Sequence, residues 1–120
     1  MPGYSIAQIS EQSGLSPHTL RYYEKESLIQ EVPRDAGGRR RYGDAHLKVI
    51  KFVNALRATG MPIREIRRYL AFYQLGPATR DERLALLESH RANVKAELDA
   101  VRTNLKIIDR KILGYKEGEY

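Results

Sequence analysis

The pattern of hydrophobic positions in the first 26 residues predicts two short helices. In SIAQISEQSG, two isoleucines at helical spacing follow Ser5, a preferred N-cap residue, and Gly14 supplies a C-terminal stop. In LSPHTLRYYEKES the pattern restarts, with Ser16 as the N-cap and Pro17 at the first helical position. Two helices joined by about three residues that include a glycine are typical of a helix-turn-helix.

Two further amphipathic segments lie between residues 44 and 76. DAHLKVIKFVNALRATG predicts a third helix that ends near Gly60, and MPIREIRRYLAFYQLG predicts a fourth with Pro62 near its start. The apolar positions that define the third helix are Leu47, Ile50, Val53 and Leu56. In the fourth, the inward positions are Ile63, Ile66 and Leu70, and the mostly outward ones are Arg64, Arg67 and Arg68.

From Arg80 onward the pattern becomes that of a coiled coil. Apolar residues recur at alternating steps of three and four over more than four heptads, with no Pro or Gly before Gly114. From Arg80 to Tyr115 such a helix is about 54 Å long, which exceeds the roughly 30 Å diameter of a 77-residue domain. A second copy of the chain is the economical partner for this seam. The seam consists of Leu84, Leu87, Arg91, Val94, Leu98, Val101, Leu105, Ile108, Ile112 and Tyr115, and its eight aliphatic members are the predicted dimer contacts.

Charges beside the seam leave the orientation of the two helices open. Glu97 and Arg102 would pair in a parallel dimer. Glu88 with Arg102, or Lys95 with Asp109, would pair in an antiparallel one. Arg91, inside the seam, either buries only its aliphatic stem or fixes the register.

The second predicted helix carries an outward face suited to nucleic acid. If Leu20 points to the core, Tyr23 lies about 60° away at the core edge. The opposite half then holds His18, Arg21, Tyr22 and Lys25, which offer cationic and hydroxyl groups for phosphates and base edges. An ordinary solvated helix face explains the same pattern about equally well. Which of the two tyrosines contacts DNA stays open.

An arginine-rich segment, VPRDAGGRRRYGD, separates the second and third helices. Pro33, Gly37 and Gly38 break helical structure, and the glycine pair suits the tip of a short hairpin or wing. Arginines flank the tip on both sides, and their forked guanidinium groups match phosphate geometry. They are Arg34, Arg39, Arg40 and Arg41. We therefore favour a nucleic-acid contact over a merely solvated loop.

The net charge of the chain supports a nucleic-acid partner, and the distribution of that charge indicates which part of the chain binds it. The 120 residues carry a net charge of +6 with a pI of about 9.7, which favours an anionic partner. Residues 1–77 hold 12 Lys+Arg against 7 Asp+Glu, whereas residues 78–120 hold 9 against 8. We therefore predict a DNA-binding domain over 1–77, followed by a dimerisation helix and short tail over 78–120.

Several other classes of protein are disfavoured. There is no cysteine, which excludes disulfides and thiolate metal sites, and no segment has the features of a leader or a membrane span. The three histidines, His18, His46 and His90, are far apart in sequence, and no nucleophile motif or glycine-rich phosphate loop is present. We expect a cytoplasmic protein that is not an enzyme, needs no cofactor and does not bind membranes.

The elements together resemble the MerR family of bacterial transcriptional regulators. The resemblance covers Tyr4 to about Tyr115: YSIAQISEQSGLSPHTLRYYEKESLI, then GGRRRY, then LKVIKFVNALRATGMPIREIRRYL, then the long terminal helix. It implies a winged helix-turn-helix domain joined to an antiparallel coiled-coil dimerisation helix. Such dimers bind pseudo-palindromic promoter sites with overlong spacers and distort them so that RNA polymerase can use the promoter.

The resemblance also assigns DNA contacts to residues of this chain. On the recognition helix they fall on His18, Thr19, Arg21 and Tyr23, with Tyr22 beside them. In the wing they fall on Arg34, Arg39 and Arg40, and after the third helix on Arg57. Both Tyr22 and Tyr23 can contact DNA if Tyr23 lies at the core edge with its hydroxyl reaching a phosphate.

The chain departs from the family where signals are sensed. Metal-sensing members use thiolates at the ends of the dimerisation helix, and electrophile-sensing members use a thiol in the third helix, where this chain has Asn54, Ala55 and Leu56. Multidrug-sensing members carry an effector domain after the coiled coil, and this chain stops within five residues of Tyr115. The resemblance thus points to a short, cysteine-free member. Unless the chain is truncated, its effector is unknown, or it acts constitutively or through a partner.

Two binding modules without gene-activating function are the alternatives. An accessory or architectural DNA-binding dimer would bind DNA tightly without affecting polymerase. A coiled-coil adaptor would bind DNA only weakly and non-specifically, with a dissociation constant on the order of 10⁻⁴ to 10⁻⁶ M. We favour the regulator because the recognition helix, the wing and the coiled coil agree. The operator, the regulated genes and the choice between activation and repression do not follow from the sequence.

Overall fold

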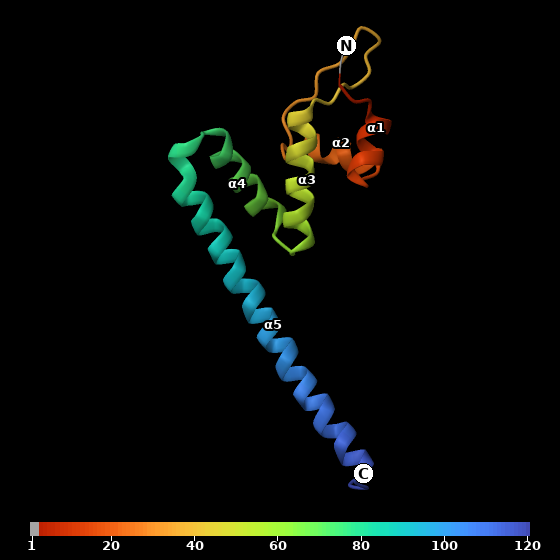
Figure 1. Ribbon diagram of the computed structural model, residues 1–120, viewed down its shortest axis with the longest axis vertical. Coiled ribbons are helices and arrows are strands. Elements are labelled where there is room, and N and C mark those ends of the chain that lie inside the picture. The colour runs from red at the N-terminus through yellow and green to blue at the C-terminus, as the bar shows by residue number, and fades with distance from the viewer. Residues whose placement is uncertain (1–2) are drawn as a thin grey trace. The chain divides into compact units, whose positions relative to one another are not determined.

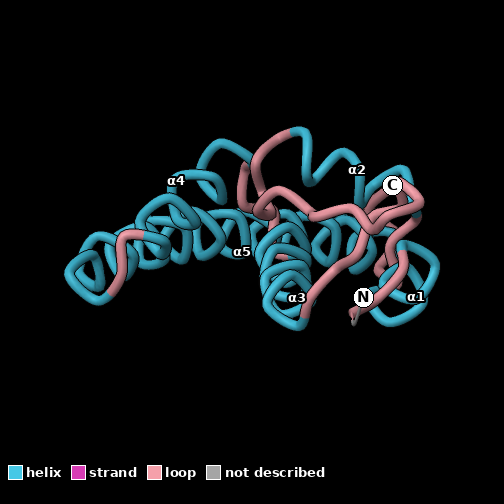
Figure 2. Tube along the Cα trace, turned by 90° about the horizontal axis from the view of Figure 1, so that it is seen from above, coloured by secondary structure: helices cyan, strands magenta, loops and turns pink. Residues whose placement is uncertain are grey.

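The computed structural model describes residues 3–120, and the chain divides into two units, Met1–Arg80 and Asp81–Tyr120. The first unit holds α1 (Ile6–Ser13), α2 (Pro17–Lys25), α3 (Asp44–Ala58), α4 (Ile63–Gln74) and a 3₁₀ turn, η1 (Pro77–Thr79) (Figure 1). The second is the single helix α5 (Arg80–Lys116) and a short tail. Residues 3–120 contain no regular strand (Figure 2). The predicted mainly α fold is confirmed.

The helix ends of the helix-turn-helix lie where the capping residues predicted them. Ser5 Oγ accepts the Gln8 N–H at 3.2 Å, and the Gln8 side chain accepts the Ser5 N–H at 2.8 Å. Ser16 Oγ accepts the Thr19 N–H at 3.1 Å at the start of α2. Gly14 ends α1 with φ of 73°, a left-handed conformation that favours glycine. The two helices are therefore joined through a turn set by local sequence.

The core of the first unit is built by all four helices and by the segment between α2 and α3. Its α1 packs on α2 and α3, and α3 packs on α4. The buried apolar side chains are Ile9, Leu20, Tyr23, Leu28, Ile29, Val32, Tyr42, Ile50, Val53, Met61, Ile66, Tyr69 and Leu70. Helical periodicity predicted Ile50, Val53, Ile66 and Leu70 correctly, whereas Leu47, Leu56 and Ile63 are only half-buried. Each fully buried large side chain contributes about 1.5–3 kcal/mol relative to exposure.

The segment between α2 and α3 forms the wing as a loop stabilised by isolated backbone pairs. Tyr42 exchanges two backbone hydrogen bonds with Tyr4, at 2.7 and 2.8 Å, which joins the base of the wing to the N-terminal segment. Nearer the tip, Asp35 N–H donates to Arg39 O at 2.8 Å, and Gly38 turns the chain with φ of 79°. The predicted glycine tip is present. The chain on either side of it is joined by an isolated backbone bridge, Arg34–Arg40, and does not form a regular hairpin.

The long helix of the second unit has the predicted extent, and its seam faces solvent. Seven seam residues have between 37% and 54% of their surface exposed: Leu84, Val94, Leu98, Val101, Leu105, Ile108 and Ile112. Leu87 is half-buried. At the end of the helix the chain turns back, so that the Tyr120 ring stacks on Tyr115 with a centroid distance of 4.7 Å. Tyr120 covers Gly114, where a Cβ would lie 2.6 Å from the ring.

Candidate nucleic-acid interface

The two tyrosines of α2 have different surroundings. Leu20 is fully buried and Tyr23 is 1% exposed, whereas Tyr22 is 36% exposed. His18 and Arg21 are exposed as well. The helical wheel therefore assigned the inward and outward positions correctly, and Tyr22 is the ring that a partner of this face would meet first.

The Tyr23 hydroxyl is already engaged within the protein. It donates to Asn54 Oδ1 at 2.8 Å and accepts from Arg57 Nη1 at 3.2 Å. The Arg57 guanidinium also lies 5.6 Å from the centre of the Tyr23 ring, which is cation–π distance. Because one hydrogen bond and the ring of Tyr23 hold its guanidinium, Arg57 is oriented by α2 even though it comes from α3. Asn54 in turn donates to Ser13 O at 3.5 Å, which joins α3 to the end of α1.

Glu24 joins α2 to the wing through what we call the Glu24 bridge, formed by Glu24, Val32 and Arg40. One carboxylate oxygen accepts the Val32 N–H at 2.9 Å, and the other accepts Arg40 Nε at 2.8 Å. The side chains of Glu24 and Arg40 are only 19% and 23% exposed. A charge-assisted pair in such surroundings is less screened than one on an open surface. The bridge therefore fixes the approach of the wing to the recognition helix.

The electrostatics of the Glu24 bridge favour the charged carboxylate. Partial burial raises the pKa of Glu24, but the Val32 N–H and the Arg40 guanidinium that it binds, together with nearby Arg34, outweigh this effect. The pKa of Glu24 consequently lies below the ordinary value of 4.5. At neutral pH the bridge is fully formed.

Asp35 organises the wing tip. Its carboxylate accepts the backbone N–H groups of Gly37 and Arg39 at 2.9 and 3.0 Å, and these bonds, the Arg39 one foremost, lower the pKa of Asp35. Arg34 Nη1 donates to Gly38 O at 2.8 Å across the tip. Arg39 is exposed, and its guanidinium has no hydrogen bond or ion pair to any of residues 3–120. The tip is thus a hydrogen-bonded turn that presents an exposed arginine.

A second ion pair joins the end of α2 to α4. Arg67 Nη2 lies 2.8 Å from Glu26 Oε2, and Arg67 Nε donates to the Glu26 carbonyl at 3.0 Å. Glu26 is the C-cap of α2. Sequence analysis placed Arg67 on the outward face of its helix, which is correct, and it did not foresee this partner.

The structure brings three of the predicted DNA-contacting residues to one recess between α2 and the wing. Arg21, Arg34 and Arg40 line it, together with Lys25 and the acidic residues Glu24 and Glu31. The lining does not include His18, Thr19, Tyr22, Tyr23 or Arg39. Arg57 belongs instead to the α3 end, beside Tyr23. Thr19 is half-buried, and its hydroxyl lies 3.0 Å from that of Ser16, so it supports the helix start.

Two residues that organise this face were not among the predicted site residues. Glu24 fell beside Leu20 on the helical wheel, and an acidic residue at the edge of a core is a signal for a buried partner. Asn54 was noted only as the residue in place of a thiol. Their partners lie eight to 41 positions away in sequence, so spacing along a single helix does not reveal them.

Two protein families match this chain. Residues 4–73 match the family described as MerR HTH family regulatory protein, and residues 47–110 match the one described as MerR, DNA binding. The chain belongs to the MerR family. It is a DNA-binding transcriptional regulator, as the family and the relatives below are. The resemblance inferred from the sequence is confirmed.

Relatives of this MerR family protein match nearly its whole length. An uncharacterized HTH-type transcriptional regulator of Haemophilus influenzae is 34% identical over 97% of this chain and 86% of its own. A MerR family regulator from Listeria monocytogenes has 34% identity and a TM-score of 0.83, covering 97% of this chain and 88% of that one. HiNmlR, a MerR family regulator lacking the sensor domain and crystallised with promoter DNA, has 33% identity and a TM-score of 0.75, covering 98% and 94%.

This MerR family protein offers no group of residues suited to a metal ion in the part that the structure describes. The chain has no cysteine, and no three His, Asp or Glu side chains among residues 3–120 cluster closely enough to hold an ion. No helix in that range is long and apolar enough to cross a membrane. Asn54, which the sequence analysis noted in place of a sensing thiol, accepts a hydrogen bond from the Tyr23 hydroxyl.

Proposed function

We propose that two copies of this regulator pair through their α5 seams in antiparallel orientation and bind a pseudo-palindromic promoter site. The long seam along α5, which is apolar at every position except Arg91, is the observation that carries this proposal. Single exposed apolar residues are common, but an apolar stripe this long marks an interaction surface. Its alternating three- and four-residue steps fit a partner helix of the same kind, and antiparallel pairing is the arrangement that the family resemblance implies.

Each copy would read DNA with α2 in the major groove and with the wing on the flanking backbone. His18, Arg21 and Tyr22 present donors and an aromatic edge on the exposed face of α2, where base edges are read. Arg39 at the wing tip is suited to a phosphate contact. Arg34 is held by the wing tip and Arg57 by Tyr23, and both retain further guanidinium donors for the backbone.

Arg40 has a different part in this proposal from the one that the sequence analysis gave it. Its Nε is bound to Glu24, and its side chain is mostly buried. Removing it would leave the Glu24 carboxylate without its cationic partner. We therefore assign Arg40 to positioning the wing, with any phosphate contact made by its remaining donors.

Binding of this kind would deform the promoter spacer and so act on RNA polymerase. A dimer with two fixed reading helices imposes its own spacing on the two half-sites. Bending or untwisting the intervening duplex costs about 1–6 kcal/mol, which contacts between the basic residues and phosphates would offset. The crystal structure of HiNmlR bound to promoter DNA supports the promoter-binding part of this proposal.

The experiment that tests the proposal is fluorescence-anisotropy titration with DNA from upstream of this protein's own gene and of its neighbour. It is run at physiological salt, with and without unrelated competitor DNA. We expect nanomolar binding that survives the competitor, and a change in transcript level when polymerase is added to the bound template. Binding that the competitor abolishes would contradict promoter specificity at those sites. Tight binding without any effect on transcription would favour an accessory DNA-binding dimer.

A further inference from the structure

A groove between α3 and α4 is not used by the proposed function. It is a cavity of about 480 Å³, within the size range of small-molecule sites. Phe52 of α3 stacks on Tyr69 of α4 with ring centroids 5.0 Å apart and an interplanar angle of 28°. Phe52 is 37% exposed and Tyr73, one turn after Tyr69, is 46% exposed. An open aromatic surface of this kind, the aromatic groove, is costly to leave in water.

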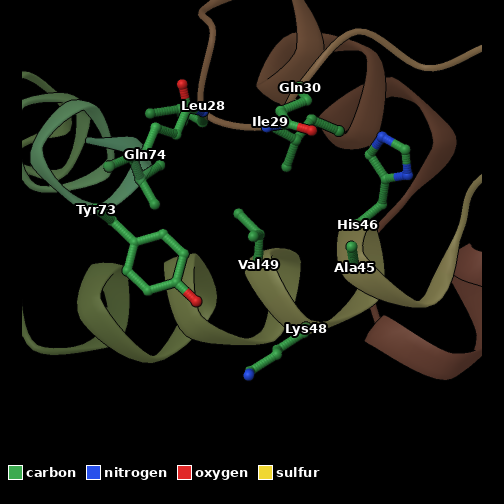
Figure 3. A pocket seen from close by; sticks show the side chains of 10 residues that line it. Leu28, Ile29, Gln30, Ala45, His46, Lys48, Val49, Tyr73 and Gln74 are labelled. Atoms are coloured by element: carbon green, nitrogen blue, oxygen red, sulfur yellow. The ribbon is translucent and has the colours of Figure 1, made fainter. Parts of the chain in front are cut away.

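The aromatic groove continues into a second cavity. That cavity, of about 260 Å³, shares Lys48, Val49, Leu70 and Tyr73 with it. Val49 points into the second cavity, Tyr73 and His46 stand at its opposite ends, and Lys48 points away from it (Figure 3). The two hollows therefore form a mostly apolar trough along the pair of helices, with room for a ring system.

Two lysines give the aromatic groove its charge. Lys48 and Lys51 lie at its edge on α3, and both are exposed. Neither has an ion pair with an acidic side chain of residues 3–120. No acidic side chain lines the groove. Apolar aromatic walls with two unpaired cations at the rim complement a flat apolar molecule that carries a negative charge.

We propose that the aromatic groove of α3 and α4 binds a small aromatic anion, such as an aromatic carboxylate. The ring system contacts Phe52, Tyr69 and Tyr73, and the acid group lies toward Lys48 and Lys51. Both helices that form the groove are bonded to α2 or its cap, α3 through Asn54–Tyr23 and α4 through Arg67–Glu26. Any effect of the bound anion on promoter affinity would rest on the proposed function, but the binding itself does not.

A matched pair of probes tests this proposal on the full chain. Isothermal titration calorimetry would compare 2-naphthoate with 2-naphthamide, which has the same rings and no charge. We expect saturable binding of 2-naphthoate at one site per chain, about fivefold tighter than that of the amide, as two partly exposed charge contacts allow. The Lys48→Gln/Lys51→Gln variant should bind both probes equally. Arg64→Gln should keep the preference, because Arg64 is exposed and lies on the opposite side of α4 from Tyr73.

Three results would overturn the proposal. The first is equal affinity for the two probes in the wild type. The second is a preference for 2-naphthoate that persists in Lys48→Gln/Lys51→Gln, with circular dichroism showing an unchanged fold. The third is binding seen only after the seam is broken by Leu98→Asp/Leu105→Asp, which would mean that a second copy of the chain occupies the groove. Promoter binding is measured separately, by fluorescence anisotropy. A failure of anion binding in the groove can therefore be told apart from a failure of promoter binding.

Discussion

In residues 3–80 the large apolar side chains lie mostly inside, whereas along α5 every apolar seam residue except the half-buried Leu87 is exposed. The two units also differ in whether their polar side chains bond to other elements. The carboxylates of Glu24, Glu26 and Asp35 all bind arginines or backbone N–H groups elsewhere in the first unit. On α5 the ion pair Lys95–Asp99 joins neighbouring turns of one exposed helix. The first unit can thus fold on contacts within one chain, whereas the exposed seam of α5 is the surface that we propose pairs with a second copy.

Breaking the seam is the strongest test of the contrast between the buried core of the first unit and the exposed seam of α5. Leu98→Asp with Leu105→Asp puts two like charges into the predicted dimer contact, so we expect monomers by light scattering. Binding of a two-half-site promoter should weaken by about 100-fold or more, because the second half-site is no longer linked to the first. The near-ultraviolet signal of the first unit should persist.

The matched control for this experiment lies on the opposite side of α5. Ala96→Asp with Thr103→Asp has the same seven-residue spacing and charge, on positions away from the seam. It should stay dimeric and bind DNA. If the seam variant stayed dimeric, or if the control also dissociated, the seam would not be the dimer contact.

Breaking the Glu24 bridge is the next test. It distinguishes an effect on the position of the wing from an effect on the overall charge that attracts DNA. Glu24→Gln makes the protein more positive, which would strengthen simple attraction to DNA. We expect instead about tenfold weaker promoter binding, because the charge-assisted contact that holds the wing is lost. The slope of log affinity against log salt should change little. Arg39→Ala should lower affinity and also flatten that slope by about one, as loss of a phosphate contact does.

An equal flattening of the salt slope in Glu24→Gln and Arg39→Ala would contradict the positioning role. So would unchanged or tighter promoter binding by Glu24→Gln. Arg40→Ala adds a check, because it removes the same bridge from the wing side. If the slope of log affinity against log salt were as flat for Arg40→Ala as for Arg39→Ala, Arg40 would be a phosphate contact and not only a residue that positions the wing.

The difference between the two units also explains what the sequence could predict. Caps and apolar periodicity predicted α1, α2 and α5 because these signals are local, such as Ser5 with Gln8 at α1. The helical wheel separated Tyr22 from Tyr23 for the same reason. Bonds between elements were missed: Glu24 reaches Arg40 across 16 positions, and Tyr23 reaches Asn54 across 31. No periodic pattern encodes such pairs, because they depend on how a loop and a helix pack together.

The two tyrosines of α2 give a smaller and sharper test. Tyr23→Phe leaves the part-buried Asn54 oxygen without its donor and Arg57 without an acceptor, so we expect a loss of about 1–2 kcal/mol in the free energy of unfolding. Tyr22→Phe should leave stability within about 0.5 kcal/mol, because its ring faces solvent. DNA affinity should fall about two- to fivefold for Tyr22→Phe if its hydroxyl meets a phosphate or base. Urea unfolding and anisotropy measure both effects, and a reversed order of stabilities would contradict the assignment of the inward ring.

The pH dependence of the Glu24 bridge tests the charge of the carboxylate directly. Because the pKa of Glu24 is lower in the folded protein than its ordinary value of 4.5, the charged carboxylate stabilises the fold above that value. This stabilisation is lost as the pH falls from about 4.5 through the lowered folded-state pKa, when the carboxyl takes up its proton. The wild type should therefore exceed Glu24→Gln in the free energy of unfolding by about 1–2 kcal/mol at pH 7 and by nearly the same amount at pH 5.5. At pH 3.5 the two should approach each other. A difference that stayed constant or grew on acidification would show that the variant acts through lost packing and not through the charge that joins the wing to the recognition helix.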